Sequence, residues 1–244
     1  MKYLRSMPLI FVTVLLSSLV LTMLKIAGKK KMRQKLQTAV YQATIKIWRI
    51  KITQIGQLAP PPAMIIANHC SYLDVAFIGS LGAMRFTPKS EVKNWFLIGR
   101  VVRAFDVIFI DRNPKRTQQV KQELQQAMQQ GGRLCIFPEG TTNNGLELKP
   151  FKSSMFSLIN DPQINLQPIA IKYKSVDGTP MNPQIWENIA WFGDAALIPH
   201  MWRLGRFRHI EVEVHCLPII ATNGANRKEL AQQAEQMIKN IVMS

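Results

Sequence analysis

The sequence predicts an α/β fold in which helices flank a largely parallel central sheet, preceded by an N-terminal membrane helix or helical pair. Beyond residue 57, short apolar segments of strand length alternate with segments of helical pattern, which is typical of a layered α/β domain. Ahead of that domain, Met7 to Leu24 form an 18-residue run without a charge, close to the length that a membrane-spanning helix needs. The 244 residues are enough for one domain with a full core and a small appendage.

Basic residues surround the apolar run. The formal net charge is +16, and the 11 Lys and Arg residues before Asp74 are matched by no acidic residue. Lys2 and Arg5 would also suit a signal peptide, but the run is long for one, and a basic cluster from Lys25 to Lys35 stands where a cleavage site would be. We therefore expect an uncleaved anchor in the cytoplasmic membrane, single-pass or monotopic. The basic cluster would bind anionic membrane lipid, and the following domain would lie on the cytoplasmic side.

The segment from Gln34 to Ile55 mixes isoleucines with basic residues. This pattern suits an interfacial helix lying along the bilayer and equally suits an amphipathic helix packed on the domain. The three prolines at 60–62 cannot continue a helix. We place the boundary there, so that residues 1–56 form the anchor with a basic amphipathic helix and residues 57–244 form the globular domain.

Strands and helices alternate beyond the boundary. The expected strands are 64–67, 107–110, 134–137, 167–172 and 210–216, and the expected helices begin near residues 72, 114, 153 and 227. Residues 64–67 are uniformly apolar, as in a parallel strand buried on both faces. Residues 210–216 instead alternate apolar with polar residues, which predicts a strand with one solvated face.

Asp74 follows His69 by five positions, where the first of these strands gives way to a helix. A carboxylate at this spacing can hold one imidazole nitrogen and leave the other to take a proton from a hydroxyl, as a general base does. Catalytic residues favour strand ends on rigid scaffolds. The residues alone support a second interpretation equally well, in which Asp74 caps the helix and His69 packs at the strand end.

Cysteine and histidine usage argues against several other chemistries. The three cysteines predict no disulfide in a cytoplasmic domain, and Cys70 is a poor nucleophile partner for the adjacent His69 because neighbouring side chains diverge. The four histidines show no metal-binding spacing, so no metal site is predicted. The cations concentrate beside an apolar run, and no block of interleaved aromatic and basic residues appears, so we expect no nucleic-acid partner.

Three further segments follow the His69–Asp74 motif in order. The four segments are Asn68-His69-Cys70-Ser71-Tyr72-Leu73-Asp74; Pro88-Lys89-Ser90-Glu91 with Gly99 and 107–112; Phe137-Pro138-Glu139-Gly140-Thr141 with Phe151-Lys152; and Gln167-Pro168-Ile169-Ala170-Ile171. Together they resemble the motifs of the glycerolipid acyltransferases, the 1-acylglycerol-3-phosphate acyltransferase family. The resemblance implies that residues 57–244 transfer a fatty acyl group to the free hydroxyl of a membrane lysolipid. The donor would be a thioester of coenzyme A (acyl-CoA) or of acyl carrier protein, with no cofactor.

The same resemblance implies roles for individual residues. His69 would deprotonate the acceptor hydroxyl while Asp74 fixes the tautomer of its ring. Lys89 and backbone amides near Gly140 are the candidates for stabilising the negative oxygen of the tetrahedral intermediate. The candidates for binding the acceptor are Arg112, Glu139, Thr141 and Thr142. Arg112 could instead bind the phosphates of the donor, or form only a surface ion pair with Asp111 or Glu139.

The third segment departs from the family at one position. Family members commonly follow Glu-Gly-Thr with an arginine that grips a phosphate monoester, and Thr142 stands there instead. This favours lysolipids with larger head groups, including lyso-ornithine lipid, over lysophosphatidic acid. Residues 190–194 and 199–202 also resemble the lyso-ornithine lipid branch. One hypothesis of a different class stays open, a non-catalytic, basic, membrane-anchored lipid-binding module.

Overall fold

The structure, a computed structural model, describes residues 15–16, 18–23, 25–95, 98–110, 114–159 and 163–244. Its strands are β1 (Ile50–Ile55), β2 (Ala63–Ala67), β3 (Arg85–Phe86), β4 (Arg133–Ile136), β5 (Asn165–Val176), β6 (Thr179–Pro180) and β7 (Ile210–Cys216). They form one sheet in the order β1-β7-β5-β2-β4-β3, with β6 paired to β5. All neighbours on this path pair in parallel except β5 and β7, which are antiparallel. The predicted α/β fold with a mostly parallel sheet is confirmed.

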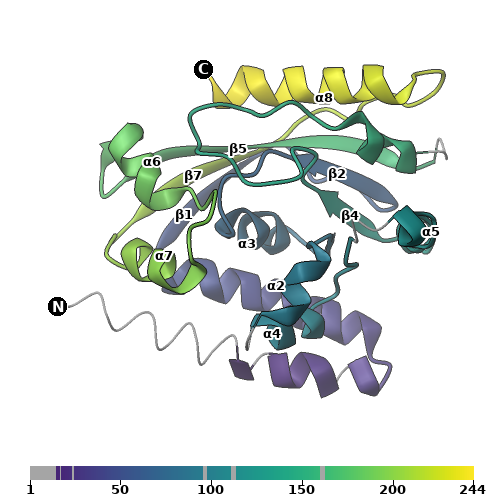
Figure 1. The fold of residues 1–244 in the computed structure, drawn as a ribbon, viewed down its shortest axis with the longest axis horizontal. Coiled ribbons are helices and arrows are strands. Elements are labelled where there is room, and N and C mark those ends of the chain that lie inside the picture. Colours follow the sequence, from purple (N-terminus) through teal and green to yellow (C-terminus); the bar gives the residue numbers. More distant parts are fainter. Residues whose placement is uncertain (1–14, 17, 24, 96–97, 111–113, 160–162) are drawn as a thin grey trace.

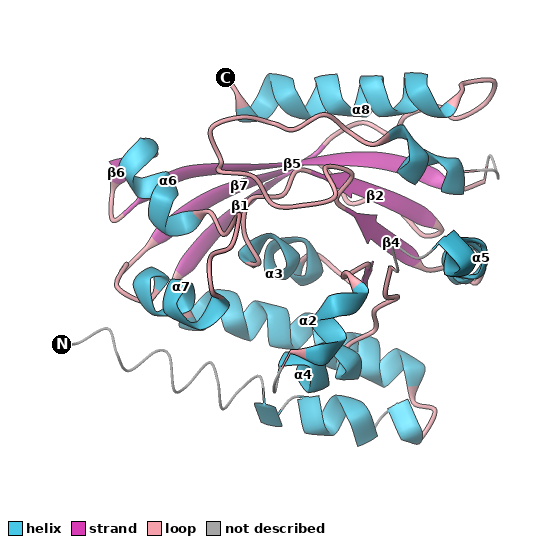
Figure 2. Ribbon diagram, in the orientation of Figure 1, coloured by secondary structure: helices cyan, strands magenta, loops and turns pink. Residues whose placement is uncertain are grey.

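Helices cover both faces of this sheet (Figure 1). The α-helices are α2 (Lys30–Ile47), α3 (Leu73–Ser80), α4 (Ile98–Ala104), α5 (Pro114–Gln129), α6 (Pro183–Ile189), α7 (Leu197–Leu204) and α8 (Arg227–Val242), and two short 3-10 helices are η1 (Ser90–Asn94) and η2 (Ser153–Leu158). Figure 2 shows α2, α3, α4 and α7 on one side of the sheet and α8 on the other.

The central strand β2 divides the core in two. All five of its residues are buried, and successive side chains of a strand point to opposite faces. Ala63, Ile65 and Ala67 therefore pack into the core under α2 and α3. Met64 and Ile66 pack into the core under α8 and α5. A parallel strand that is buried on both faces is expected to be uniformly apolar.

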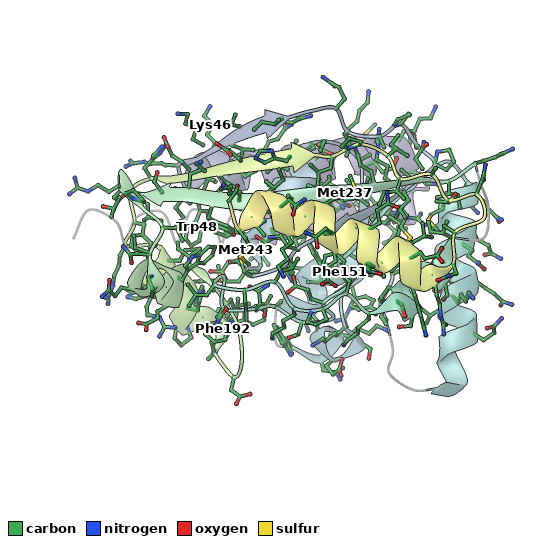
Figure 3. The ribbon with its side chains drawn as sticks, turned by 90° about the horizontal axis from the view of Figure 1, so that it is seen from above. Lys46, Trp48, Phe151, Phe192, Met237 and Met243 are labelled. Carbon is green, nitrogen blue, oxygen red and sulfur yellow. The ribbon has the colours of Figure 1, made fainter. Side chains whose placement is uncertain are left out.

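Helix α8 has clear sequence signals at its start and along its inner face. Asn226 caps its first turn and exchanges hydrogen bonds with Glu229 in a capping box. Its buried residues, Leu230, Ala231, Ala234 and Ile238, recur at helical spacing. Seen from above in Figure 3, α8 crosses the sheet close to Phe151, whose backbone N–H donates to Glu235 at 2.7 Å.

Helix α2 is packed on the domain. Arg33 bonds Asp106 at 3.0 Å, and both side chains are buried. Gln37 donates to the carbonyl of Met84 and accepts from the backbone N–H of Asp106. The chain then turns into β1, which pairs with β7, so the sheet already begins before the prolines at 60–62.

Three local predictions differ from the structure. Residues 107–110 make only isolated bridges, Val107 to Phe86 and Ile110 to Lys89, because they lie beside the two-residue edge strand β3. The segment after Ser153 is the short η2 rather than an α-helix. The helical pattern expected over 34–55 ends at Ile47, since the next residues join the sheet.

The predicted anchor Met7–Leu24 lies mostly outside the described residues. Its described parts, 15–16 and 18–23, are helical. Within the part of the chain that the structure describes, no helix combines the length and the apolar character needed to cross a membrane.

Candidate active site

Asn68 fixes the point at which the chain leaves β2. Its amide group donates to the carbonyl of Ile171 at 3.0 Å and accepts from the Ile171 N–H at 2.8 Å. The side chain thus continues the pairing of β2 with β5 by one residue, and Asn68 itself is buried. His69 follows at the carboxyl end of a central parallel strand, where ligands bind in open α/β sheets.

Asp74 is fully buried and accepts four hydrogen bonds. Its Oδ2 accepts from His69 Nδ1 at 2.9 Å and from the backbone N–H groups of Cys70 and Ser71, each at 2.8 Å. Its Oδ1 accepts from the Tyr173 hydroxyl at 2.8 Å. Burial, together with the adjacent carboxylate, raises the pKa of Tyr173 well above its ordinary value, so this hydroxyl keeps its proton. Asp74 therefore shapes the turn and also holds the imidazole.

The His69 ring is held on a second side by Phe137. The two rings stack with their centroids 3.9 Å apart and their planes at 13°. The His69 side chain keeps 16% of its exposure, and among the described residues its Nε2 has no hydrogen-bond partner. Because Nδ1 faces a carboxylate, the neutral ring carries its proton on Nδ1. Nε2 is then the unprotonated nitrogen of the ring.

Glu139 organises the loop that covers His69. Its Oε1 accepts from the His69 N–H at 2.7 Å, and its Oε2 accepts from the Asn143 amide at 2.6 Å and the Lys149 N–H at 3.1 Å. Burial raises the pKa of Glu139, although these hydrogen bonds oppose the rise. Asn143 also donates its N–H to the His69 carbonyl at 2.9 Å. Loop 139–149 is thereby hydrogen-bonded to both the N–H and the carbonyl of His69.

Gly140 adopts a left-handed conformation, with φ at 71°. A Cβ at this position would overlap the ammonium end of Lys152, so glycine satisfies both the backbone and the space. The Gly140 N–H donates to the Phe137 carbonyl at 3.0 Å. Thr141 is exposed, whereas the carbonyl of Thr142 accepts from Lys149 Nζ at 3.2 Å. Two lysines therefore approach the Glu-Gly-Thr turn.

Lys89 and Arg112 come from the second segment of the resemblance. Lys89 precedes η1 and bridges Ile110 through the backbone. Arg112 lies outside the described residues, so each of the roles expected for it stays a prediction. Of the predicted site residues, His69, Asp74 and Glu139 are joined by direct hydrogen bonds.

Residues from the C-terminal half cover the other side of the motif. The Trp191 N–H donates to the Cys70 carbonyl at 2.8 Å, and the Trp191 ring contacts Tyr72 and Trp95, each with centroids 5.9 Å apart. Buried His200 reaches the Tyr72 hydroxyl at 3.2 Å through Nδ1 and the Ala190 carbonyl at 3.0 Å through Nε2. Burial lowers the pKa of His200, which favours its neutral form.

Sequence reasoning missed four of these residues: Tyr173, Asn143, Trp191 and His200. Asn143 is four positions from Glu139, and Trp191 and His200 lie in segments already noted for their resemblance, so these three had a weak signal. Tyr173 follows an apolar strand as any core tyrosine would. Its contact with Asp74 spans 99 positions, and no local pattern announces it.

Other chemistries find no support in the described part of the chain. There, no group of three or more His, Cys, Asp or Glu side chains could hold a metal ion. All three cysteines are free and buried. Burial raises the pKa of Cys70 well above that of an ordinary thiol, so this thiol is a poor nucleophile.

Comparison with known proteins supports the family resemblance. The acyltransferase family model matches residues 49–172. The chain is 33% identical to a lyso-ornithine lipid O-acyltransferase of Pseudomonas aeruginosa, over 75% of this chain and 69% of that protein. It is 26% identical to one of Brucella abortus, over 88% and 85%. It is 25% identical to a 1-acyl-sn-glycerol-3-phosphate acyltransferase of Neisseria gonorrhoeae, over 78% and 74%.

One solved structure has a similar fold along the whole chain. It is the 1-acyl-sn-glycerophosphate (LPA) acyltransferase PlsC of Thermotoga maritima, at a TM-score of 0.64 and 14% identity, covering 100% of this chain and 98% of that one. The predicted resemblance is therefore confirmed in both sequence and fold.

Proposed function

The chain belongs to the acyltransferase family, and from that premise we propose that it moves a fatty acyl group from a thioester to the hydroxyl of a membrane lysolipid. The observation that carries this proposal is the His69–Asp74 pair. Its carboxylate is fully buried, its imidazole is fixed by a hydrogen bond and a stacked ring, and its outer nitrogen has no partner among the described residues.

In the proposed reaction, the acceptor hydroxyl attacks the thioester carbonyl while its proton passes to Nε2 of His69. A C–O bond forms and the tetrahedral intermediate carries the negative charge on oxygen. Collapse of the intermediate breaks the C–S bond, and the proton on His69 neutralises the departing thiolate. Asp74 stabilises the imidazolium between these two steps. No acyl-enzyme is needed, since the acceptor is itself the nucleophile.

We propose cations for the developing oxyanion and for the acidic groups of the substrates. Lys89 and the backbone near Gly140 keep the roles that the resemblance implies. Because the Gly140 N–H already bonds Phe137, Lys152, whose ammonium group lies against Gly140, is a further candidate. Glu139 holds the loop through hydrogen bonds to Asn143 and Lys149, while the exposed Thr141 is free to contact the acceptor.

The acceptor class follows from Thr142 and from the relatives. Several relatives are named for lyso-ornithine lipid, and Thr142 cannot form the bidentate contact that an arginine makes with a phosphate monoester. We propose a lysolipid with a larger, partly cationic head group as the preferred acceptor. The proposed donor is a thioester of either coenzyme A or acyl carrier protein.

We also propose that the enzyme works at the cytoplasmic membrane, attached by its apolar N-terminal segment and by the basic cluster that follows it. The described helical residues of this segment expose Leu16, Leu19 and Met23, by 58%, 56% and 59%. Side chains at this spacing share one helix face, and such a face suits a bilayer.

A thioester-consumption assay with and without lysolipid tests the proposal. The wild type should release free thiol only when a lysolipid is present. His69→Ala should lower turnover by roughly 10²-fold or more, within the range of general-base contributions. His69→Ala at near wild-type rate would overturn the mechanism, and no thiol release by the wild type with any lysolipid would favour a non-catalytic lipid-binding module.

A further inference from the structure

Helix α7 and the loop before it expose large apolar side chains next to the candidate active site. Ile198 and Trp202 lie one helical turn apart and are 59% and 45% exposed, and Phe192 in the preceding loop is 41% exposed. The opposite side of the helix is anchored, since His200 and Leu204 are fully buried. The outward direction of these apolar groups is therefore set by the fold.

The same segment is cationic. Arg203 and Arg206 are exposed near Trp202, and Asp194 is the one acidic residue between Phe192 and His209. Exposed aromatic and aliphatic groups flanked by arginine are typical of surfaces that lie in the headgroup region of an anionic bilayer. Three apolar side chains are too few for the core of a stable protein–protein interface, which buries about 1,200–2,000 Å².

Contacts within the molecule link this segment to the catalytic motif. His200 of α7 bonds the Tyr72 hydroxyl, and Trp191 donates to the Cys70 carbonyl. Tyr72 and Cys70 both belong to the turn between His69 and Asp74. α7 lies on the side of the sheet opposite α8, as do α2 and the described helical residues near the N-terminus (Figure 1). In Figure 3, Phe192 lies well apart from α8.

We infer that α7, with Phe192, is a second membrane-contacting surface that rests on anionic lipid. Ile198, Trp202 and Phe192 enter the boundary between headgroups and acyl chains, and Arg203 and Arg206 meet the lipid phosphates. α7 is hydrogen-bonded to the turn between His69 and Asp74. Binding of α7 to the bilayer therefore holds that turn at the depth of the lipid hydroxyl. The inference concerns where the molecule touches the membrane and holds whichever lysolipid is the acceptor.

Site-specific labelling of the full chain tests this contact directly. The native cysteines, Cys70, Cys135 and Cys216, are buried, so an introduced surface cysteine can be labelled selectively with an environment-sensitive fluorophore. Trp202→Cys reports on α7. Ile219→Cys is the matched control, because Ile219 is 47% exposed but adjoins Ile220 of the core under α8. Both proteins are bound to phosphatidylglycerol–phosphatidylcholine vesicles containing nitroxide-labelled lipid.

The label at 202 should shift its emission to the blue and be quenched at a depth of about 5–10 Å below the headgroups, whereas the label at 219 should do neither. Arg203→Glu with Arg206→Glu should reverse most of the quenching at 202. Equal behaviour of the two labels would overturn the inference. A blue shift at 202 without vesicles that grows with protein concentration would also overturn it, because the surface would then bind a second copy of the chain.

Turnover separates this inference from the proposed reaction. Ile198→Ser with Trp202→Ser should lose most activity on vesicle-embedded acceptor but keep wild-type activity on acceptor dispersed in detergent micelles, and Ile219→Ser should lose neither. Equal losses in micelles and on vesicles would show that α7 has no membrane role. Absence of thiol release by the wild type under both conditions would instead refute the proposed reaction.

Discussion

Asp74→Asn isolates the negative charge of the His69–Asp74 pair, the proposed general base. The Oδ2 position faces three donors, His69 Nδ1 and the N–H groups of Cys70 and Ser71, while Oδ1 faces only the Tyr173 hydroxyl. An asparagine will place its carbonyl oxygen at the three-donor position and its NH₂ toward Tyr173, whose oxygen can accept. The variant should therefore keep the His69 tautomer and the shape of the turn. What it loses is the attraction between carboxylate and imidazolium.

The size of that loss follows from the geometry. The joined atoms are 2.9 Å apart, and each charge is spread over its ring or carboxylate. At an effective dielectric constant of about 20, two unit charges about 4 Å apart attract by about 4 kcal/mol. Since about 1.4 kcal/mol corresponds to a tenfold change in rate, kcat should fall by roughly a thousandfold.

Tyr173→Phe is the matched control for Asp74→Asn. It removes a hydrogen bond from the same carboxylate without removing the charge, and the retained ring can still pack against Phe77 and Trp186. A hydrogen bond to a charged group contributes about 1.5–3 kcal/mol, so its loss should slow turnover by roughly ten- to a hundredfold, less than the loss of the charge. Thioester consumption measured from pH 5 to 9, with thermal melting as a check on folding, compares the two variants. A loss of turnover smaller than tenfold in Asp74→Asn would refute the general-base mechanism.

Three further predictions concern the acceptor, the anchor and pH. Thr142→Arg should shift preference toward lysophosphatidic acid over lyso-ornithine lipid by roughly ten- to a hundredfold, since a bidentate contact contributes about 1.5–3 kcal/mol. Product ratios in a competition assay measure this shift. A wild type that already prefers lysophosphatidic acid would contradict the prediction. Deleting residues 1–24 should leave salt-sensitive membrane binding through the basic residues 29–35, so a truncated protein that stays in the soluble fraction at low salt would exclude that role. The folded-state pKa of His200 is lowered by burial, so the unfolded chain takes up this proton near pH 6.5, before the folded protein does, as pH falls. The free energy of unfolding should then drop by at most about 1.4 kcal/mol per pH unit, and denaturant titrations at pH 7.5 and 5.5 should show a smaller drop for His200→Gln.

The local part of the site could be read from the sequence. His69 and Asp74 are five positions apart at a strand end, so one turn of backbone suffices to join them. The residues alone could not choose between a general base and a helix cap with a packed histidine. In the structure the carboxylate bonds the ring and two backbone N–H groups of the turn that precedes α3, and the role of the pair as a general base stays a prediction.

Helix α2 could not be placed from its own residues. They mix apolar and basic side chains, a pattern that suits a bilayer surface as well as a protein surface. The placement depends on Asp106, which lies 73 positions from Arg33 and receives it in a buried ion pair. A pattern within the helix carries no information about a partner so distant in the chain.

By itself, the sequence determined the α/β class, the position of the His69–Asp74 pair and the family, because each depends on neighbouring residues or on motifs in a fixed order. Only the tertiary structure decided that Tyr173 bonds Asp74, that Glu139 clasps the His69 backbone, and that α7 turns Ile198 and Trp202 outward. These features join segments about 70 to 130 positions apart. The sheet register and the packing of α7 against the catalytic turn create such contacts, and local periodicity does not encode them.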